Sequence, residues 1–459
     1  MNILTVDFGS TYTKLTAIDA THAVILGTAS AFTTIEQDIV HGFNAALRSL
    51  ESRIGAFRYD RLLCCSSAGG GLKMVALGLV PELTAKAARL AASSAGAKVI
   101  KTYSFEISRG EQEEIHAIDP DIILLCGGTD GGNKDVIIAN ARRLCEIDRD
   151  FIVIVAGNKS ASHEVKGIFE QHGREYVITD NVMPSFNKLE IEPARNSIRE
   201  VFIRKIIDAK GLSGIQAMAS ADVIPTPLAV MAGCELLSRG TAKTPGIGDF
   251  MAVDLGGATT DIYSMSDGKP IMSNVLEKGL PEPFAKRTVE GDLGMRYSLG
   301  SLFEASGIEA LAEISSAEES EVTAWVRTCM AAPDTLATCP GEERIDAALA
   351  RKAVEIAVER HCGTLESSYT PLGEIFTLTG KDLSDTAYII GIGGAIINSR
   401  QPADILRGAV YDPRKPHILK PRHPEFRIDG KYIFASMGLL GSIDPELALN
   451  FMKQEIMRN

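Results

Sequence analysis

Two short segments far apart in the chain combine an aspartate with glycines and small hydroxyl residues. They read D-F-G-S-T-Y-T-K at residues 7–14 and V-D-L-G-G-A-T-T-D at residues 253–261. Glycine has no Cβ atom, so its backbone N–H can approach an anionic oxygen closely, and serine and threonine add short donors. Such turns are typical of phosphate binding. Lys14 could add a positive charge, although a strand lysine can equally face solvent. We expect phosphate contacts from Gly9, Ser10, Thr11, Thr13, Lys14, Gly256, Gly257, Thr259 and Thr260.

The aspartates of these segments are candidate metal ligands and catalytic residues. Asp7 and Asp254 each follow an apolar run, where a carboxylate is costly to bury without a partner. Magnesium keeps several waters and takes one or two carboxylates together with phosphate oxygens, so one aspartate from each segment suits it. Asp261 is a third candidate for orienting water or the metal. An aspartate beside glycine often caps its own turn, but the repeated context favours the ligand role.

A third glycine-rich segment, Y-I-I-G-I-G-G-A-I-I-N, occupies residues 388–398. Gly391, Gly393 and Gly394 follow a strand-like run and could let the backbone lie flat against an adenine or a ribose. Tight packing of a helix on a strand is the alternative explanation of these glycines.

Alternating strands and helices must position these turns. Residues 1–18 alternate in a way that predicts a β-hairpin through the first turn. Further along, strands are predicted at 122–125, 151–156 and 176–179, and helices at 80–95, 133–144, 164–171, 194–209, 307–324 and 345–361. Residues 411–424 contain four prolines and predict an irregular loop. Strands that alternate with helices indicate an α/β architecture.

The length of 459 residues favours two lobes, because single hydrophobic cores rarely grow this large. Proline and glycine in residues 238–249 place the junction near residue 245, giving an N-terminal lobe of residues 1–245 and a C-terminal lobe of 246–459. Each predicted lobe begins with or near an Asp-Gly hairpin. The strand at 122–128, I-I-L-L-C-G-G, also resembles Y-I-I-G-I-G-G at 388–394. We therefore predict a duplicated unit with a ligand between its copies.

The composition of the chain narrows the classes of partner and the compartment that we expect. The net charge of −12 and the pI near 5.3 disfavour nucleic acid as a partner. No run approaches the roughly 20 apolar residues of a membrane span. The start MNILTVDFGS lacks the features of a signal peptide, so we expect a cytoplasmic protein. None of the eight cysteines forms a C-x-x-C pair. They are therefore expected to be reduced and mostly buried, with a zinc cluster built from distant cysteines as the alternative.

The three glycine motifs, in this order, resemble the actin-like ATPase superfamily, which includes actin, sugar kinases and the seventy-kilodalton heat-shock chaperones. Residues 7–14 resemble its first phosphate motif, 253–261 its second, and 389–395 its adenosine motif. The resemblance implies a two-lobed α/β fold of duplicated ribonuclease H-like domains, with ATP and Mg²⁺ as cofactors. The long separation of the first two motifs leaves room for an inserted α/β subdomain in the N-terminal half.

The whole chain also resembles the MutL/GlmL family, accessory proteins of adenosylcobalamin-dependent glutamate (methylaspartate) mutase. The resemblance lies in residues 119–132, in N-V-M-P at 181–184, in I-P-T-P-L-A-V at 224–230 and in G-D-L-G-M-R at 291–296. It implies a chaperone-like reactivase, in which ATP hydrolysis opens the mutase so that damaged cobalamin leaves. The implied partner is therefore a mutase subunit.

Other functions stay open at this point. A small-molecule kinase of the same fold would use an aspartate between the lobes as its base, and a polymerising actin-like protein would share the nucleotide site. A cobalamin-binding module is disfavoured, because no D-x-H-x-x-G segment occurs. The hydrolytic base is also open: Thr129 and Asp130 could face a cleft, or could cap a helix before Asn133.

Overall fold

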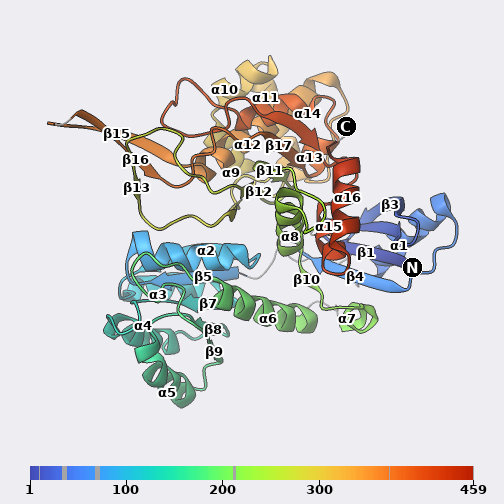
Figure 1. Ribbon diagram of the computed structural model, residues 1–459. Coiled ribbons are helices and arrows are strands. Elements are labelled where there is room, and N and C mark those ends of the chain that lie inside the picture. Colours follow the sequence, from blue (N-terminus) through green and yellow to red (C-terminus); the bar gives the residue numbers. More distant parts are fainter. Residues whose placement is uncertain (10, 34–38, 68–72, 210–212, 372, 458–459) are drawn as a thin grey trace. The chain divides into compact units, whose positions relative to one another are not determined.

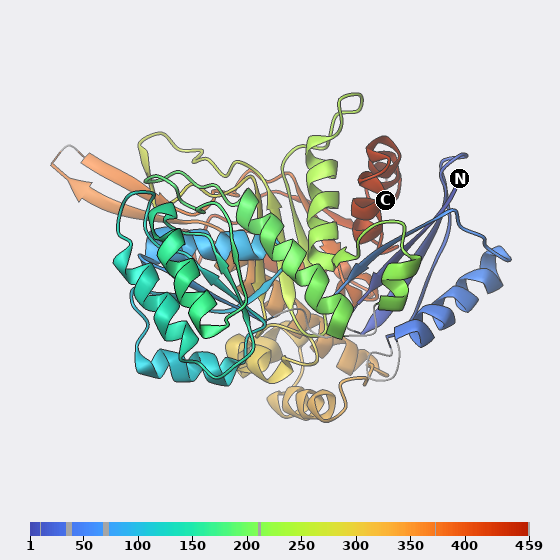
Figure 2. The same cartoon turned by 90° about the horizontal axis from the view of Figure 1, so that it is seen from below.

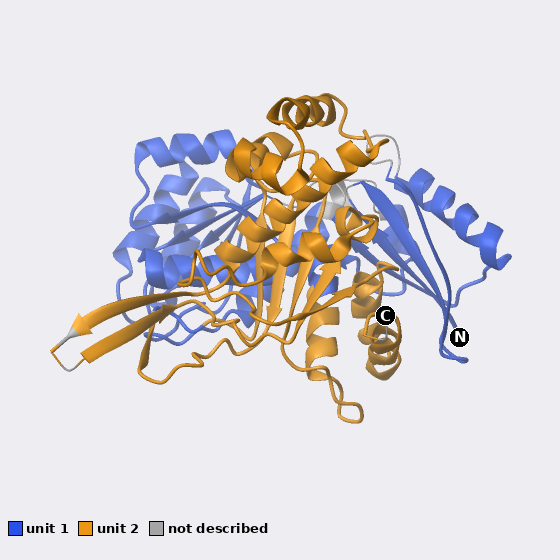
Figure 3. Ribbon diagram, turned by 90° about the horizontal axis from the view of Figure 1, so that it is seen from above, with its two compact units in different colours: residues 1–230, 279–281 blue, residues 231–278, 282–459 orange. Residues whose placement is uncertain are grey.

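The computed structural model describes the chain except residues 10, 34–38, 68–72, 210–212, 372 and 458–459. The chain forms two compact units (Figure 3). Unit 1 comprises residues 1–230 and 279–281, and unit 2 comprises residues 231–278 and 282–459. The boundary falls inside helix α8 (Thr226–Arg239), earlier than the predicted junction near 245. The glycines and proline that suggested a linker form a turn within unit 2, where Gly240 pairs with Pro245.

The first sheet of unit 1 contains the predicted hairpin. β1 and β2 are antiparallel, β3 is antiparallel to β2, β4 runs parallel to β1, and β10 runs parallel to β4. Helix α1 (Ile39–Ile54) packs on β2 and β3. The sheet order is β10-β4-β1-β2-β3, with bounds β1 (Asn2–Phe8), β2 (Tyr12–Asp19), β3 (Val24–Phe32), β4 (Arg61–Ser66) and β10 (Ile224–Pro225).

The main sheet of unit 2 repeats this topology. β11, β12 and β14 are antiparallel neighbours, β17 runs parallel to β11, and β18 runs parallel to β17. The order is β14-β12-β11-β17-β18, with bounds β11 (Phe250–Leu255), β12 (Thr260–Met265), β14 (Ala285–Glu290), β17 (Tyr388–Ile392) and β18 (Glu425–Ile428). The repeated strand order and directions confirm the predicted duplicated α/β fold of the actin-like class.

One half of the predicted sequence repeat was wrong. The sequence paired residues 122–128 with residues 388–394, but the counterpart of β17 in unit 1 is β4. Each of these two strands lies parallel to the strand that carries the aspartate, with Cys65 beside Asp7 and Ile392 beside Asp254. The strand at 122–125 lies in a different sheet. Apolar runs are common to buried parallel strands, so the likeness of the two segments has no topological meaning.

An all-parallel sheet is inserted between β4 and β10 in the sequence, as predicted for the N-terminal half. Its order is β6-β5-β7-β8-β9, the doubly wound order in which the chain reverses direction beside its first strand. The apolar run of β7 is buried on all four residues, as expected for a strand covered on both faces. The strands are β5 (Lys73–Gly78), β6 (Lys98–Ser104), β7 (Ile122–Leu125), β8 (Ile152–Val155) and β9 (Tyr176–Ile178).

Helices cover both faces of this inserted sheet (Figure 1). The predicted helix at 80–95 begins as a π-helix, and short helices η2 (Lys159–Ala161) and α7 (Ser213–Met218) were not predicted. The remaining helices of this region either coincide with predicted helical ranges or connect strands. They are η1 (Pro81–Ala85), α2 (Lys86–Ser94), α3 (Arg109–Ile118), α4 (Asp135–Cys145), α5 (Ser162–His172) and α6 (Glu192–Ala209).

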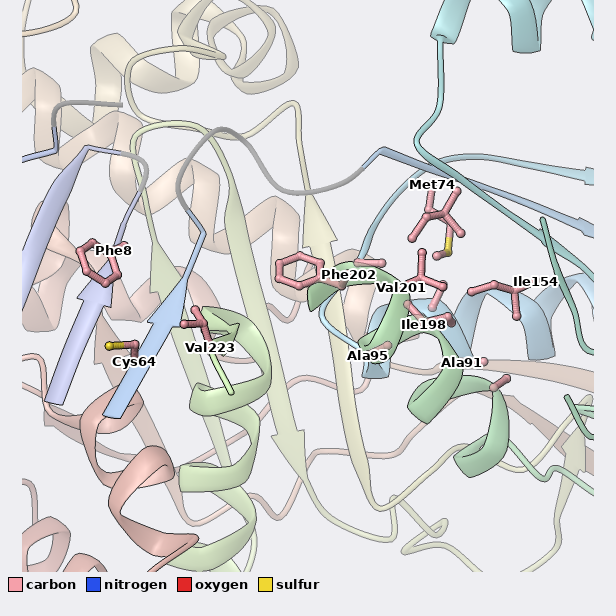
Figure 4. Close-up of a cluster of buried hydrophobic side chains, with 14 of the residues drawn as sticks. Phe8, Cys64, Met74, Ala91, Ala95, Ile154, Ile198, Val201, Phe202 and Val223 are labelled. Atoms are coloured by element: carbon pink, nitrogen blue, oxygen red, sulfur yellow. The ribbon is translucent and has the colours of Figure 1, made fainter. Parts of the chain in front are cut away.

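Helix α6 joins the core of the inserted sheet to the core of the first sheet. Ile198 and Val201 point toward Met74 and Ile154 of the inserted sheet (Figure 4). Phe8 and Cys64 of the first sheet belong to the same cluster of buried side chains. The amphipathic period that predicted this helix is therefore confirmed for Ile198, Val201 and Phe202, while the side chains of Ile206 and Ile207 lie outside the described ones.

Unit 2 surrounds its sheet with helices and extends one exposed arm. The predicted helix at 307–324 is two helices, because the chain turns at Ser316, which has a left-handed φ of 52°. The helices are α9 (Leu299–Ser306), α10 (Ile308–Ser315), α11 (Glu319–Ala331), α12 (Pro340–His361), α13 (Gly394–Ile397), α14 (Pro402–Leu406), η3 (Arg407–Ala409), α15 (Phe434–Gly441) and α16 (Pro445–Glu455). No helix within the described ranges is long and apolar enough to cross a membrane.

The arm of unit 2 is a three-stranded sheet of order β13-β16-β15. Strands β15 (Thr364–Thr370) and β16 (Gly373–Thr379) form a hairpin that projects from the body of unit 2 (Figure 2), and β13 (Val275–Lys278) pairs with β16. Tyr369, near its tip, is 83% exposed. The sequence analysis did not predict this element.

Candidate functional site

The two Asp-Gly turns close in the same way. In unit 1 the Gly9 N–H donates to the Tyr12 carbonyl at 3.1 Å, and in unit 2 the Gly256 N–H donates to the Thr259 carbonyl at 2.9 Å. A Cβ atom on Gly9 would lie 2.6 Å from the Tyr12 carbonyl oxygen, and one on Gly256 would lie 3.1 Å from that of Thr259. The first turn therefore needs glycine at position 9, apart from any contact with a ligand, whereas a side chain at position 256 would be crowded.

The carboxylate of Asp7 lies at the end of β1 and is 8% exposed. Its Oδ1 accepts a hydrogen bond from Thr226 Oγ1 at 2.6 Å and lies 3.6 Å from Cys65 Sγ. Its Oδ2 lies 3.5 Å from Lys14 Nζ. Lys14 thus forms an ion pair with Asp7, which stands opposite it in the hairpin register. Burial, with a contribution from the Asp7 charge, raises the pKa of the Cys65 thiol, which is therefore neutral and can donate to the carboxylate.

The sequence analysis missed Thr226 and Cys65. Both reach Asp7 because β4 lies between β1 and β10, so the carboxyl ends of all three strands meet at one edge of the sheet. The proline-rich segment around Thr226 was noted for its resemblance alone, and no local pattern in it indicates a contact with residue 7.

The hydroxyl residues of the first turn differ in their placement. Thr13 is fully buried, and its Oγ1 lies 3.1 Å from Thr33 Oγ1. The Thr11 carbonyl accepts from the Thr33 N–H, and its side chain is half-buried. Ser10 lies outside the described residues. Among the described hydroxyl residues of this turn, Thr11 is therefore the one that is exposed enough to contact a ligand.

In unit 2, Asp254 stands opposite Asp261 in the β11–β12 register, where unit 1 has Asp7 opposite Lys14. Asp261 Oδ1 accepts from Arg287 Nε at 2.9 Å, and its Oδ2 accepts from Thr259 Oγ1 at 2.9 Å. Both Asp261 and Arg287 are buried. Asp261 is thus neutralised by a cation of its own sheet, whereas Asp254 is half-buried at the end of β11.

A loop after β14 packs on the second turn. The N–H groups of Met295 and Arg296 donate to the carbonyls of Gly256 and Gly257 at 3.1 and 2.8 Å. Thr260 is fully buried, and its hydroxyl donates to the Leu293 carbonyl at 2.7 Å, so it fastens this loop. The segment G-D-L-G-M-R therefore shapes the turn that carries the predicted phosphate contacts.

The third glycine motif lies directly beside the second. Gly393 has a φ of +91°, and a Cβ atom there would lie 2.3 Å from the Leu255 carbonyl oxygen. A Cβ on Gly391 would lie 2.7 Å from the Ile396 side chain, so close packing of helix on strand explains this glycine. A Cβ on Gly394 would meet the Tyr432 hydroxyl at 3.0 Å. Unit 2 thus brings two of the three predicted motifs to one edge of its sheet.

Two further segments noted in the sequence meet in the inserted sheet. Asn181 Nδ2 donates to the Gly128 carbonyl and to Asp130 Oδ1, both at 3.0 Å, and the Asp130 N–H donates to the Pro184 carbonyl. The hydrogen bonds of Asp130 therefore connect the loop after β7 to the loop after β9. It does not cap α4, where Asn133 accepts from the Val136 N–H instead.

Magnesium fits the donors of both turns only as an ion held mostly by water and phosphate. Among the described residues, no group of three or more His, Cys, Asp or Glu could hold a metal by itself. Asp7 and Asp254 each offer a carboxylate beside a glycine turn, which matches the one or two carboxylates that magnesium takes when phosphates supply the rest.

Comparisons with known proteins agree on one family. A family model described as MutL protein matches residues 3–456. The chain is also similar to Protein MutL of Clostridium tetanomorphum, with 47% identity over 460 residues and 99% of each chain covered.

The likenesses to solved structures are distant. A glycerol dehydratase reactivase aligns with 96% of this chain and 99% of its own, at 9% identity and a TM-score of 0.35. Xylulose kinase from Lactobacillus acidophilus aligns with 99% of this chain and 92% of its own, at 10% identity and a TM-score of 0.34. Because both TM-scores are low, the fold assignment rests on the sheet topology.

Proposed function

Because this chain belongs to the MutL protein family, we propose that it is an ATP-dependent accessory protein that reactivates an adenosylcobalamin-dependent mutase of the glutamate (methylaspartate) type. The observation that carries the nucleotide part of this proposal is the repeated Asp-Gly turn. Gly9 and Gly256 close equivalent hairpins, each beside an aspartate at the end of the first strand of its sheet. Each such turn offers the backbone N–H groups that bind phosphate oxygens.

The chain's own residues would then have distinct tasks. Asp7 and Asp254 would hold magnesium, directly or through water, and Lys14 would offer its charge to a phosphate and to Asp7. Thr11 would donate a hydroxyl hydrogen bond to a phosphate, and Thr259 would do so on releasing Asp261, to which its hydroxyl donates in the structure. The backbone around Gly393 and Gly394 would face the adenosine. Magnesium, when bound, neutralises charge on the phosphates.

The mutase would respond to the nucleotide state of this protein. A ligand shifts a conformational equilibrium only by its different affinities for the two states, so the mutase must bind one nucleotide state more tightly than the other. We propose that ATP hydrolysis alternates these states in the cytoplasm, and that release of damaged cobalamin by the mutase accompanies one of them.

The test measures magnesium-dependent ATP hydrolysis by the purified protein, with and without an inactivated adenosylcobalamin mutase. We expect the mutase to stimulate turnover, and Asp7→Asn or Asp254→Asn to lower it by about 100-fold or more, since even residues that only orient a metal ligand cost about 10- to 100-fold when lost. Asp150→Asn, at an exposed aspartate of the inserted domain, is the matched control and should turn over ATP normally.

Two outcomes would contradict the proposal. Failure of the wild-type protein to bind ATP would reduce the glycine turns to structural elements. Transfer of phosphate to a small metabolite, with no response to the mutase, would favour a kinase of the same fold.

A further inference from the structure

The Asp7 carboxylate is held by a residue more than two hundred positions away in the sequence. Thr226 Oγ1 donates to Asp7 Oδ1 at 2.6 Å, a short distance typical of a hydroxyl bound to an ionised acceptor. Cys65 Sγ lies 3.6 Å from the same oxygen, and Lys14 Nζ lies 3.5 Å from Oδ2. The donors on Oδ1 and the cation at Oδ2 together define the direction in which the carboxylate points.

The sheet topology makes this contact stiff. β10 pairs with β4, and β4 pairs with β1, so Ile224 and Asp7 both lie beside Cys65 in register. Thr226 follows directly on β10 and begins helix α8. It stands between Pro225 and Pro227, and proline restricts both its own φ and the conformation of the residue before it. The hydroxyl is therefore presented to Asp7 with little backbone freedom.

Thr226 is the first residue of helix α8, and its hydroxyl donates to a carboxylate of another strand. Helix α8 then runs from unit 1 into unit 2, since the boundary lies between Val230 and Met231. The hydrogen bond thus attaches Asp7 to the helix through which the chain passes between the units.

We propose that Thr226 is a positioning residue: it fixes Oδ1 of Asp7 so that Oδ2 stays beside Lys14, where this oxygen would hold magnesium when the nucleotide is bound. This inference rests on the proposed function, because it assigns the second layer of the same site. Residues that orient a metal-binding carboxylate typically change affinity or activity by about 10- to 100-fold when they are lost.

The test compares Thr226→Val, which keeps the shape and removes the hydroxyl, with Thr226→Ser, which keeps the hydroxyl. We expect Thr226→Val to lower kcat for ATP hydrolysis by about 10- to 100-fold with little change in KM, and Thr226→Ser to restore most of it. A second readout is thermal stabilisation by ADP, measured with Mg²⁺ and with EDTA. Thr226→Val should keep the stabilisation seen in EDTA and lose the additional part that Mg²⁺ gives.

Thr244→Val is the matched control. Thr244 Oγ1 donates to Glu446 Oε2 at 2.8 Å in unit 2, so this change removes a threonine–carboxylate hydrogen bond away from the turns. It should leave kcat and the Mg²⁺ increment as in the wild type. A Thr226→Val protein with the wild-type kcat and Mg²⁺ increment, or a Thr226→Ser protein as impaired as Thr226→Val, would overturn this inference alone. Absence of any nucleotide effect in the wild type would overturn the proposed function and this inference together.

Discussion

At the scale of single residues, the two candidate aspartate pairs differ in how their charge is balanced. Asp7 has a lysine opposite it and a threonine beside it, whereas Asp254 has Asp261 opposite it, and Asp261 is neutralised by the buried Arg287. The sequence analysis selected all these carboxylates because each lies close to glycine in the chain. Their partners come from neighbouring strands, so only the pairing in the sheet shows which cation or hydroxyl lies beside each carboxylate.

Removing Arg287 should be strongly destabilising. Arg287→Met leaves Asp261 buried without its cation, and breaking a buried pair in this way costs about 3–5 kcal/mol. Urea unfolding measures this loss as a lower transition midpoint. Arg142→Met is the control, because Arg142 pairs with Glu164 at an exposed position, where such pairs contribute about 0–1 kcal/mol. Equal losses in the two variants would contradict the assignment of a buried ion pair.

Lys381 predicts a pH dependence of stability. It is buried in unit 2, donates to the Phe284 carbonyl at 2.6 Å and lies near Ser264; burial, with repulsion from Lys286, lowers its pKa from 10.5 to about 7. Between about pH 7 and 10.5 the unfolded chain holds a proton on this lysine that the folded chain lacks. The free energy of unfolding should therefore increase as the pH rises from about 7 to about 10.5, and this added stability is lost when the pH is lowered to 7.

The measurement is urea unfolding of the wild type and of Lys381→Met across this pH range. The wild type should gain stability relative to the variant as the pH rises, by an amount on the order of a few kcal/mol. Curves that stay parallel throughout the window would show that Lys381 keeps its ordinary pKa in the folded state.

At the scale of elements, the predicted hairpins, the strand at 122–125 and most of the long helices agree with the structure, except that 307–324 is two helices and 80–95 begins as a π-helix. The errors concern how elements are assigned to sheets. Residues 122–128 and 388–394 look alike because both end a buried parallel strand at glycine, but they occupy different sheets. Strand β15 of the arm escaped prediction because it carries few of the apolar residues on which strand prediction depends, whereas β16 carries Ile375, Phe376 and Leu378 and was overlooked.

The arm should be the first part of unit 2 to open. Residues 366–369 of β15 are exposed, whereas β11 is buried on five of its six residues and pairs on both sides. Hydrogen bonds with few buried contacts around them open at low free energy. Hydrogen–deuterium exchange read by mass spectrometry should therefore show faster exchange in peptides covering 364–369 than in peptides covering 250–255. Equal protection of the two regions would mean that the arm is stabilised by more than its own pairing.

At the scale of the whole molecule, each unit has its own core. In unit 1 an entire parallel sheet is inserted in the sequence between β4 and β10, two strands of the first sheet. The shared cluster through α6 makes the inserted sheet part of unit 1, with Phe8 and Ile154 in one set of buried side chains. The predicted division at residue 245 followed glycine and proline content. The observed division falls inside α8, because a helix can connect two cores without any break in its own hydrogen bonds.

The sequence by itself determined the local chemistry: the Asp-Gly turns, their hydroxyl neighbours, the glycines after β17 and the family resemblance all depend on residues close together in the chain. Turn geometry and strand periodicity are set over a few residues, so they can be predicted without a structure. Only the tertiary structure decided which carboxylates have partners. The contacts of Thr226 with Asp7, of Arg287 with Asp261 and of Gly393 with Leu255 join segments that are distant in sequence, and strand order alone brings them together.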